Sequence, residues 1–132
     1  MPELTCIVVT PEQTVCEEPA DFVALTLFDG EVGIARAHTP LIGRLGCGEM
    51  RIVRGDQTVR YYIEGGFVEV LKDVVSVLTQ RAVPAEDLDA AVAEEQLTAA
   101  RGRKANTPEL MTARDRAVDL SRAQLRVARR TQ

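Results

Sequence analysis

The first 83 residues alternate between short apolar runs and turn-forming residues. The runs are rich in Val, Ile, Leu and Thr, and the breaks between them contain Gly, Pro or Asp. Short runs of this kind, spaced roughly 8 to 12 residues apart, predict strands of an all-β sandwich or barrel. The expected strands cover residues 4–9, 21–28, 50–53, 58–63, 67–71 and 74–78.

Beyond Pro84 the hydrophobic period changes from that of a strand to that of a helix. Ala, Leu, Arg and carboxylates replace the β-branched residues. A first helix is expected over residues 86–101, with Glu86, Asp87 and Asp89 in its first turn, where negative charge suits the helix dipole.

A second helix is expected after the break at residues 102–107. Thr107 is a suitable N-cap, Pro108 suits the first helical position, and the helical pattern continues toward Arg129. Two helices joined by such a short loop run antiparallel. The sequence therefore predicts a β domain over residues 1–84 and a helical hairpin over residues 85–132.

The apolar faces of the two predicted helices are rich in alanine, which buries little area. At about 25 cal/mol per Å² of apolar surface, a seam of this kind gains only a few kcal/mol on closing. Other arrangements of the hairpin then lie close in energy, so that a partner can shift the population. The predicted seam residues are Leu88, Ala91, Val92 and Ala99 in the first helix and Leu110, Ala113, Ala117, Leu120 and Val127 in the second.

The composition is that of a globular protein and argues against several classes of site. Apolar residues make up 45% and charged residues 27% of the 132 residues. No apolar run approaches the roughly 20 residues that span a bilayer, so we expect membrane contact only through a partner. The cysteines Cys6, Cys16 and Cys47 lie in or beside apolar runs and are expected to be reduced core thiols. With one histidine in the chain, no metal site is predicted.

The net charge of −4 conceals an acidic body and a basic tail. Residues 1–100 carry 7 basic and 17 acidic groups, and residues 101–132 carry 9 basic and 3 acidic groups. An acidic body repels phosphates, which makes a nucleic-acid partner a poor expectation for this chain.

The single histidine lies in the stretch GEVGIARAHTPL, residues 30–41. No GxSxG, HExxH or phosphate-binding loop surrounds His38, and no carboxylate pair stands out as an acid and a base. A structural or interface histidine is therefore favoured over a catalytic one, and no catalytic residue is predicted.

The order of motifs along the chain resembles that of the epsilon subunit of the bacterial F-type ATP synthase. The resemblance covers nearly the whole chain, and it is carried by the order of the motifs rather than by any one of them. The matching stretches are TPE, GEVGI, HTPL, GEMRIV, EGGFVEV, VSVL, AEDLD and QLRVARR.

The resemblance implies a sandwich of about ten strands followed by a helical hairpin. It further implies a non-catalytic rotor subunit that couples ion-driven rotation to ATP synthesis. Its partners in that family are the gamma subunit and the c-subunit ring, and conditionally the alpha and beta subunits. The resemblance also implies a peripheral location on the cytoplasmic face of the bacterial inner membrane.

The same resemblance implies a rotor interface in the histidine-containing stretch. Glu31 matches a position facing the c ring, and His38 one near the gamma and c contacts. Where the family usually has leucine, proline and glycine, this chain has Ala35, Arg36 and Ala37. Arg36 would then add a charged contact to the ring.

The arginines of the second predicted helix allow two interpretations. Arg122, Arg126 and Arg129 recur on one helical face. They could form a solvated face partly paired with Asp115 and Asp119. The resemblance instead implies an inhibitory helix that meets acidic segments of the beta subunits and blocks hydrolysis. That helix would present Arg114, Arg116, Arg122, Arg126, Arg129 and Arg130.

Some members of the family bind ATP through a motif on the first helix of the hairpin. Leu88, Asp89 and Ala93 match this motif, but Val92 stands where its arginine belongs. A valine side chain makes no phosphate contact, so no cofactor is predicted.

Composition and periodicity without the resemblance leave a second function open. The chain could be a free-standing β-sandwich protein-binding module whose helical tail mediates dimerisation. This alternative predicts self-association through residues 85–132 and no affinity for the gamma subunit.

Overall fold

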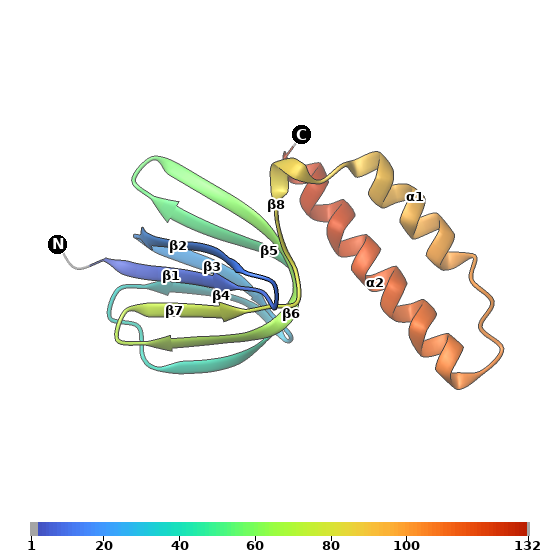
Figure 1. The fold of residues 1–132 in the computed structure, drawn as a ribbon, viewed down its shortest axis with the longest axis horizontal. Helices are drawn as coiled ribbons and strands as arrows, with labels where there is room; N and C mark the ends of the chain where they lie inside the picture. Colours follow the sequence, from blue (N-terminus) through green and yellow to red (C-terminus); the bar gives the residue numbers. More distant parts are fainter. Residues whose placement is uncertain (1–2, 132) are drawn as a thin grey trace. The chain divides into compact units, whose positions relative to one another are not determined.

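The computed structural model describes residues 3–131 and divides the chain into two compact units, with the boundary between Pro84 and Ala85 (Figure 1). Among the described residues, the regular structure of the first unit is all strand and that of the second is all helix. The strands of the first unit are β1 (Leu4–Val9), β2 (Thr14–Ala20), β3 (Phe22–Leu27), β4 (Gly30–Ala35), β5 (Leu41–Arg54), β6 (Gln57–Leu71), β7 (Val74–Leu78) and β8 (Ala82–Pro84).

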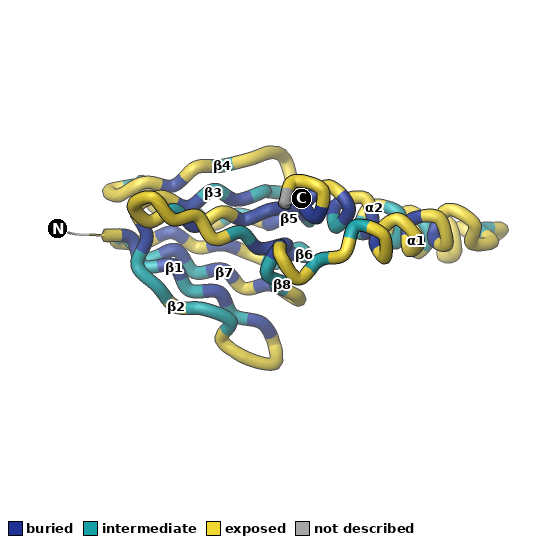
Figure 2. The backbone as a smooth tube through the Cα atoms, turned by 90° about the horizontal axis from the view of Figure 1, so that it is seen from above, coloured by how far each residue is buried: buried dark blue, intermediate teal, exposed yellow. Residues whose placement is uncertain are grey.

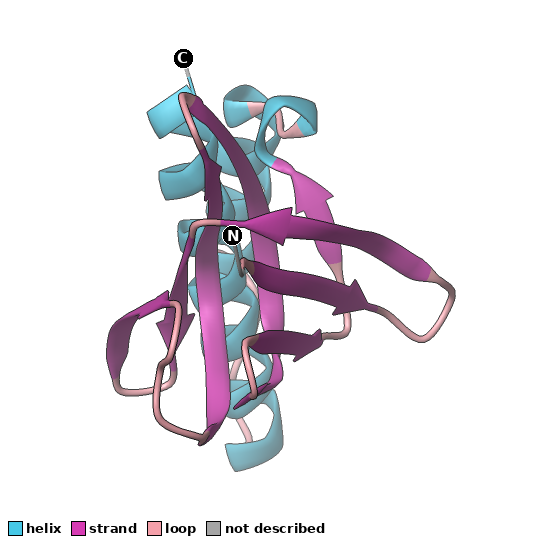
Figure 3. Cartoon of the chain, turned by 90° about the vertical axis from the view of Figure 1, so that its left-hand side faces the viewer, coloured by secondary structure: helices cyan, strands magenta, loops and turns pink. Residues whose placement is uncertain are grey.

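The strands form one continuous sheet in the order β2-β1-β7-β6-β5-β3-β4, with β8 also paired to β6. Among the strands that the structure describes, β1 and β7 pair in parallel and all other pairs are antiparallel. The long strands β5 and β6 bend sharply, so that the sheet folds over on itself around its core (Figure 3). The prediction of a β-sandwich followed by a hairpin is confirmed.

The number of strands differs from the ten that the resemblance implied. Within residues 3–131 there are eight strands, because β5 and β6, with 14 and 15 residues, each run through both halves of the folded sheet. The segments at residues 58–63 and 67–71, predicted as separate strands, are therefore parts of one strand. Gly65 and Gly66, with φ of 67° and 105°, form the bend between them.

The sandwich core comes from alternate residues of these strands, as the colouring of Figure 2 shows. In β1, Leu4, Cys6 and Val8 are fully buried, and the residues between them are half-buried. This agrees with a central strand that is apolar on both faces. Burial raises the pKa of the Cys6 thiol to about 12 and also raises that of Cys16. None of the three cysteines forms a disulfide.

The second unit begins with a short 3₁₀ helix η1 (Ala85–Asp87), followed by α1 (Ala90–Arg101) and α2 (Pro108–Thr131). The two α-helices lie side by side as a hairpin (Figure 1). Thr107 caps α2 as predicted, because its Oγ1 accepts the Leu110 N–H at 3.1 Å.

The predicted start of the first helix was wrong. The α-helix begins at Ala90 rather than residue 86, and Asp89 is its N-cap rather than a residue of its first turn. The Asp89 carboxylate accepts the N–H groups of Ala91 at 2.9 Å and Val92 at 3.3 Å. An N-cap residue has non-helical backbone angles, so the α-helix cannot extend back through Asp89 to Glu86 and Asp87. These two residues belong to the separate helix η1.

The predicted seam of the hairpin was also wrong on both helices: on α2 the seam residues are Leu125 and Val118, whereas the predicted Leu110 is 45% exposed. Ala93 and Leu97 of α1 pack against Leu125 of α2, with Ala90 and Val118 at the margin of this cluster. The predicted residue Val92 is 46% exposed instead. The buried face of α1 is thus rotated from the one that the sequence indicated.

Candidate functional site

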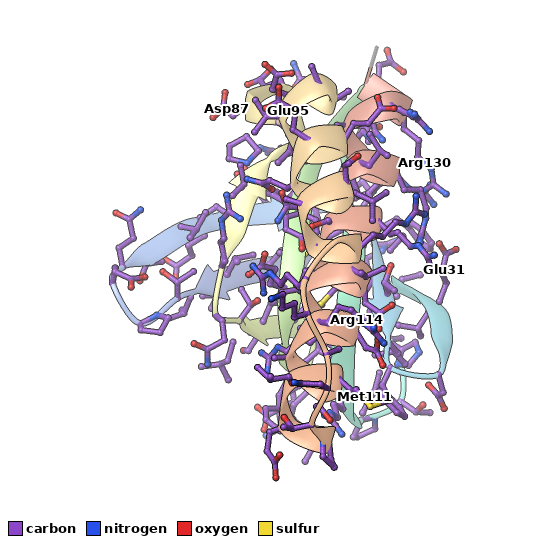
Figure 4. The ribbon with its side chains drawn as sticks, turned by 90° about the vertical axis from the view of Figure 1, so that its right-hand side faces the viewer. Glu31, Asp87, Glu95, Met111, Arg114 and Arg130 are labelled. Carbon is purple, nitrogen blue, oxygen red and sulfur yellow. The ribbon has the colours of Figure 1, made fainter. Side chains whose placement is uncertain are left out.

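Glu31 and His38 lie at opposite ends of β4. Glu31 pairs with Thr26 beside the β3–β4 turn, whereas Ala35 pairs with Phe22 at the other end of β3, and His38 follows three residues later. The four residue steps from Glu31 to Ala35 span about 13 Å of strand. The exposed side chain of Glu31 is labelled in Figure 4. The structure therefore does not bring these two predicted interface residues together.

The loop after β4 carries Arg36 and His38. Arg36 is exposed, and His38 is half-buried with its Nδ1 2.6 Å from the carbonyl oxygen of Thr39. Between them Ala37 has a φ of 61°, a left-handed conformation that L-residues rarely adopt. The loop thus has a defined shape that directs the two basic side chains.

Sequence reasoning missed an exposed apolar surface on the outer face of β5, β6 and β7. Phe67, Glu69 and Leu71 are alternate residues of β6 and therefore point to the same face of the sheet. Ile42 of β5 pairs with Glu69, and Leu78 of β7 pairs with Phe67, so both lie on that face too. We call this surface the apolar patch. It consists of Ile42, Phe67, Leu71 and Leu78, which are 78%, 58%, 45% and 54% exposed.

A signal for the apolar patch was present in the sequence but ambiguous. In the run FVEVL, Val68 and Val70 face the core, and Phe67, Glu69 and Leu71 face outward. Glu69 marks the outward set as a solvent face, but periodicity alone does not tell that the large apolar Phe67 and Leu71 remain exposed beside it. At the margin of the patch, the guanidinium of Arg44 lies over the ring of Phe28, 4.9 Å from the ring centre. This cation–π contact places a positive charge beside the apolar surface.

The second candidate surface is a groove between α1 and α2. It is open, has a volume of about 540 Å³ and has an apolar floor formed by Leu97 and Leu125. We call it the arginine groove, because its other lining residues are Arg122, Arg126, Arg129 and Arg130. Figure 4 labels Arg130 near the C-terminal end of α2.

The structure separates the six predicted inhibitory arginines into two groups. Arg129 approaches Glu94 of α1 at 3.9 Å, an exposed pair worth little in water. Arg114 lies nearer the start of α2 and pairs with Asp115 at 3.3 Å, whereas the solvated interpretation had expected Asp115 to pair with Arg122, Arg126 or Arg129. Arg116 is exposed on the same part of the helix and, like Arg114, does not line the groove.

The residues of the partial nucleotide motif have structural roles in α1. Asp89 is the N-cap, and Ala93 is buried in the hairpin seam. Val92 is exposed and offers no donor. The carboxylate of Asp89 therefore already serves two backbone N–H groups.

We predict that Asp89→Ala destabilises α1 by about 1 kcal/mol, because two N–H groups at the start of the helix lose their acceptor. Hydrogen exchange of the Ala91 and Val92 amides measures this as faster exchange. Asp87→Ala is the control, since Asp87 lies in η1 and does not cap α1. Equal exchange in both variants would contradict the assignment of the cap.

Comparison with known proteins gives one consistent result. A family model described as the β-sandwich domain of the ATP synthase delta/epsilon chain matches residues 3–85. An ATP synthase epsilon chain of Rhodopirellula baltica is 46% identical over 126 residues, covering 96% of this chain and 98% of its own length. An ATP synthase epsilon chain of Hydrogenovibrio crunogenus is 36% identical over 92% of this chain and 79% of its own length.

Solved structures show the same fold at lower identity. A chain of the Euglena gracilis mitochondrial ATP synthase, in an assembly of OSCP, F1 and c-ring, superimposes with a TM-score of 0.85 at 22% identity, covering 93% of this chain and 80% of that one. A chain from the central stalk and c-ring of the Tetrahymena thermophila enzyme has a TM-score of 0.75 at 11% identity, covering 96% and 97%. Within residues 3–131, neither helix is long and apolar enough to cross a membrane.

Proposed function

The chain belongs to the family of ATP synthase epsilon chains, non-catalytic subunits of that enzyme, and from this premise we propose how its surfaces serve the rotor. The β-sandwich docks on the gamma subunit and the c-subunit ring and so helps to couple ion-driven rotation to ATP synthesis. The helical hairpin regulates hydrolysis. Family membership argues against the alternative function, a free-standing binding module whose helical tail mediates dimerisation.

The observation that carries the docking proposal is the apolar patch. Four large apolar side chains exposed on one sheet face are unusual for a surface that only meets water. Burying such side chains against a partner is a main source of binding free energy, and aromatic residues such as Phe67 are favoured anchors. The patch supports the gamma subunit as the partner that covers this face.

The separation of Glu31 and His38 supports contact with two partners. Because they lie at opposite ends of β4, one small contact would not include both. We assign Glu31 to the c ring, and Arg36 and His38 to the region where gamma and the c ring meet. The protein would then be peripheral, on the cytoplasmic face of the bacterial inner membrane, and would be held there by the complex.

The arginine groove supports an inhibitory role for the hairpin. Four guanidinium groups around an apolar floor attract acidic segments, and arginine pairs with carboxylates in a two-pronged geometry that lysine lacks. We assign the acidic partner to the beta subunits, with Arg114 and Arg116 extending the basic surface along α2. The contact with the alpha and beta subunits is conditional on the state of the hairpin.

The test measures ATP hydrolysis by the cognate alpha, beta and gamma assembly with added full-length chain. Wild type is compared with the triple variants Arg122→Gln/Arg126→Gln/Arg129→Gln and Arg122→Lys/Arg126→Lys/Arg129→Lys. We expect wild type to inhibit, the Gln variant to bind without inhibiting, and the Lys variant to retain part of the inhibition in a salt-sensitive manner.

Two outcomes would contradict the proposal in different ways. Equal inhibition by wild type and the Gln variant would show that these arginines do not cause the inhibition, and it would not affect the docking proposal. Failure of the wild-type chain to bind the assembly would overturn the docking proposal itself.

A further inference from the structure

Two turns far apart in the sequence are joined at one end of the sandwich. The backbone N–H of Ala37, in the loop between β4 and β5, donates to Oδ1 of Asp73 at 2.7 Å. Asp73 lies in the two-residue turn between β6 and β7, where Leu71 pairs with Val74. The bond thus connects residues 36 positions apart.

Backbone conformation shows that this connection holds an otherwise unfavourable geometry. Among residues 3–131, the non-glycine residues with positive φ are Ala37, Lys72 and Asp73, at 61°, 50° and 63°. All three lie in the two joined turns. Left-handed residues other than glycine persist where surrounding contacts over-determine them, and they gather at binding and switch regions.

The joined turns lie beside the residues proposed to dock on the rotor. The loop that contains Ala37 carries Arg36 and His38, and it leads directly into Pro40 and Ile42. The other turn follows directly after Leu71. An apolar groove of about 340 Å³ runs between the two segments, lined by Pro40, Leu41, Ile42, Glu69, Val70 and Leu71.

The two walls of this groove are neighbouring strands, in which Leu41 pairs with Val70 and Ile42 pairs with Glu69, so strand pairing sets their spacing. The bond instead sets the position of the loop that leads into one wall, relative to the turn that follows the other. One wall starts just after the loop, and the other ends just before the turn. Ile42 and Leu71, one from each wall, both belong to the apolar patch. If the turns separated, strand pairing would still hold Ile42 and Leu71, but the loop that carries Arg36 and His38 would lose its fixed position beside them.

We infer that Asp73 is a positioning residue for rotor docking: by accepting the Ala37 N–H it holds the Arg36–His38 loop in the binding-competent shape beside the groove before the gamma subunit arrives. This inference rests on the proposed function. A binding segment that is ordered only part of the time loses affinity in proportion to the competent fraction. Asp73 would thus increase affinity without contacting the partner.

The experiment compares full-length wild type with Asp73→Gly and Asp73→Asn. Both replacements tolerate a φ near 63°, and glycine is favoured in a two-residue hairpin turn of this type, so neither is expected to unfold the sandwich. Asparagine keeps a side-chain oxygen at the same place as an acceptor for Ala37, whereas glycine has none. The pair therefore isolates the hydrogen bond from the strain of the turn.

Three quantities are measured on each protein: the Kd for the cognate alpha, beta and gamma assembly, the thermal unfolding midpoint, and hydrogen exchange of the Ala37 amide. We expect Asp73→Gly to bind roughly tenfold more weakly, with faster exchange at Ala37 and an unchanged unfolding midpoint. We expect Asp73→Asn to restore both the protection of Ala37 and an affinity within about twofold of wild type.

The contrary outcomes are distinguishable. If Asp73→Gly exposes the Ala37 amide yet binds like wild type, the positioning role is wrong while rotor docking stands. If Asp73→Asn binds as weakly as Asp73→Gly, the charge of Asp73 acts on the partner and the positioning role is again wrong. If wild type itself does not bind, the proposed function fails, and this inference fails with it.

Discussion

Gly66→Ala is expected to destabilise the β-sandwich by roughly 4 kcal/mol or more, which places it among the most damaging single substitutions. A Cβ at residue 66 would lie 1.9 Å from the carbonyl oxygen of Leu78 and 2.8 Å from Cα of Thr79. Both atoms belong to the backbone and cannot rotate away. The φ of 105° adds a further cost for any residue with a Cβ.

Gly65→Ala is the matched control for this substitution. Gly65 also has a positive φ, 67°, but a Cβ there meets no atom within 4 Å. Gly65→Ala should lower the free energy of unfolding by only about 1 kcal/mol, because alanine is strained in the left-handed conformation. Denaturant unfolding measures both, with equal slopes required for the comparison. Similar losses in the two variants would show that the close approach of β6 to the end of β7 is not what requires glycine at residue 66.

Leu97→Ala is expected to cost the helical hairpin about 2–3 kcal/mol. Leu97 is 7% exposed and packs against Leu125, so truncation removes most of the large apolar contact across the seam. The remaining members of this cluster are smaller than leucine: Ala90 and Ala93 on the same helix and Val118 on α2. Hydrogen exchange of the amides in α1 and α2 should therefore accelerate, while amides of the sandwich keep their protection.

Val92→Ala provides the control, because periodicity predicted Val92 in the seam and the structure leaves it 46% exposed. Its stability should change by no more than about 0.5 kcal/mol, since alanine is also the better helix former. If Val92→Ala opened the hairpin as strongly as Leu97→Ala, the seam predicted from the sequence would be right and the observed packing wrong. The result also bears on regulation, since a hairpin whose seam contains one pair of leucines beside smaller residues opens at low cost.

The elements that the sequence failed to predict are those with weak local signals. β2 contains two glutamates and Pro19, and β4 contains two glycines that were interpreted as turn residues. Both lie at the ends of the sheet order, where a strand needs only one paired neighbour. Edge strands tolerate proline and polar residues, and so they lack the apolar alternation by which strands are recognised.

The sequence by itself determined the two-part architecture, the cap at Thr107, the bend at Gly65 and Gly66, and the family, through the order of its motifs. These features depend on the local repeat of the backbone and on residues with restricted or unusual φ. Local geometry imposes a period of two on a strand and 3.6 on a helix whatever the rest of the chain does.

Only the tertiary structure decided which apolar residues remain exposed and which distant residues meet. Phe67 and Val68 are both apolar, and packing against the core selects Val68 for burial. The bond between Ala37 and Asp73 and the separation of Glu31 from His38 depend on strand pairing across long stretches of chain. Such contacts form because burial of the whole core outweighs local preference, and no local pattern in the sequence records that balance.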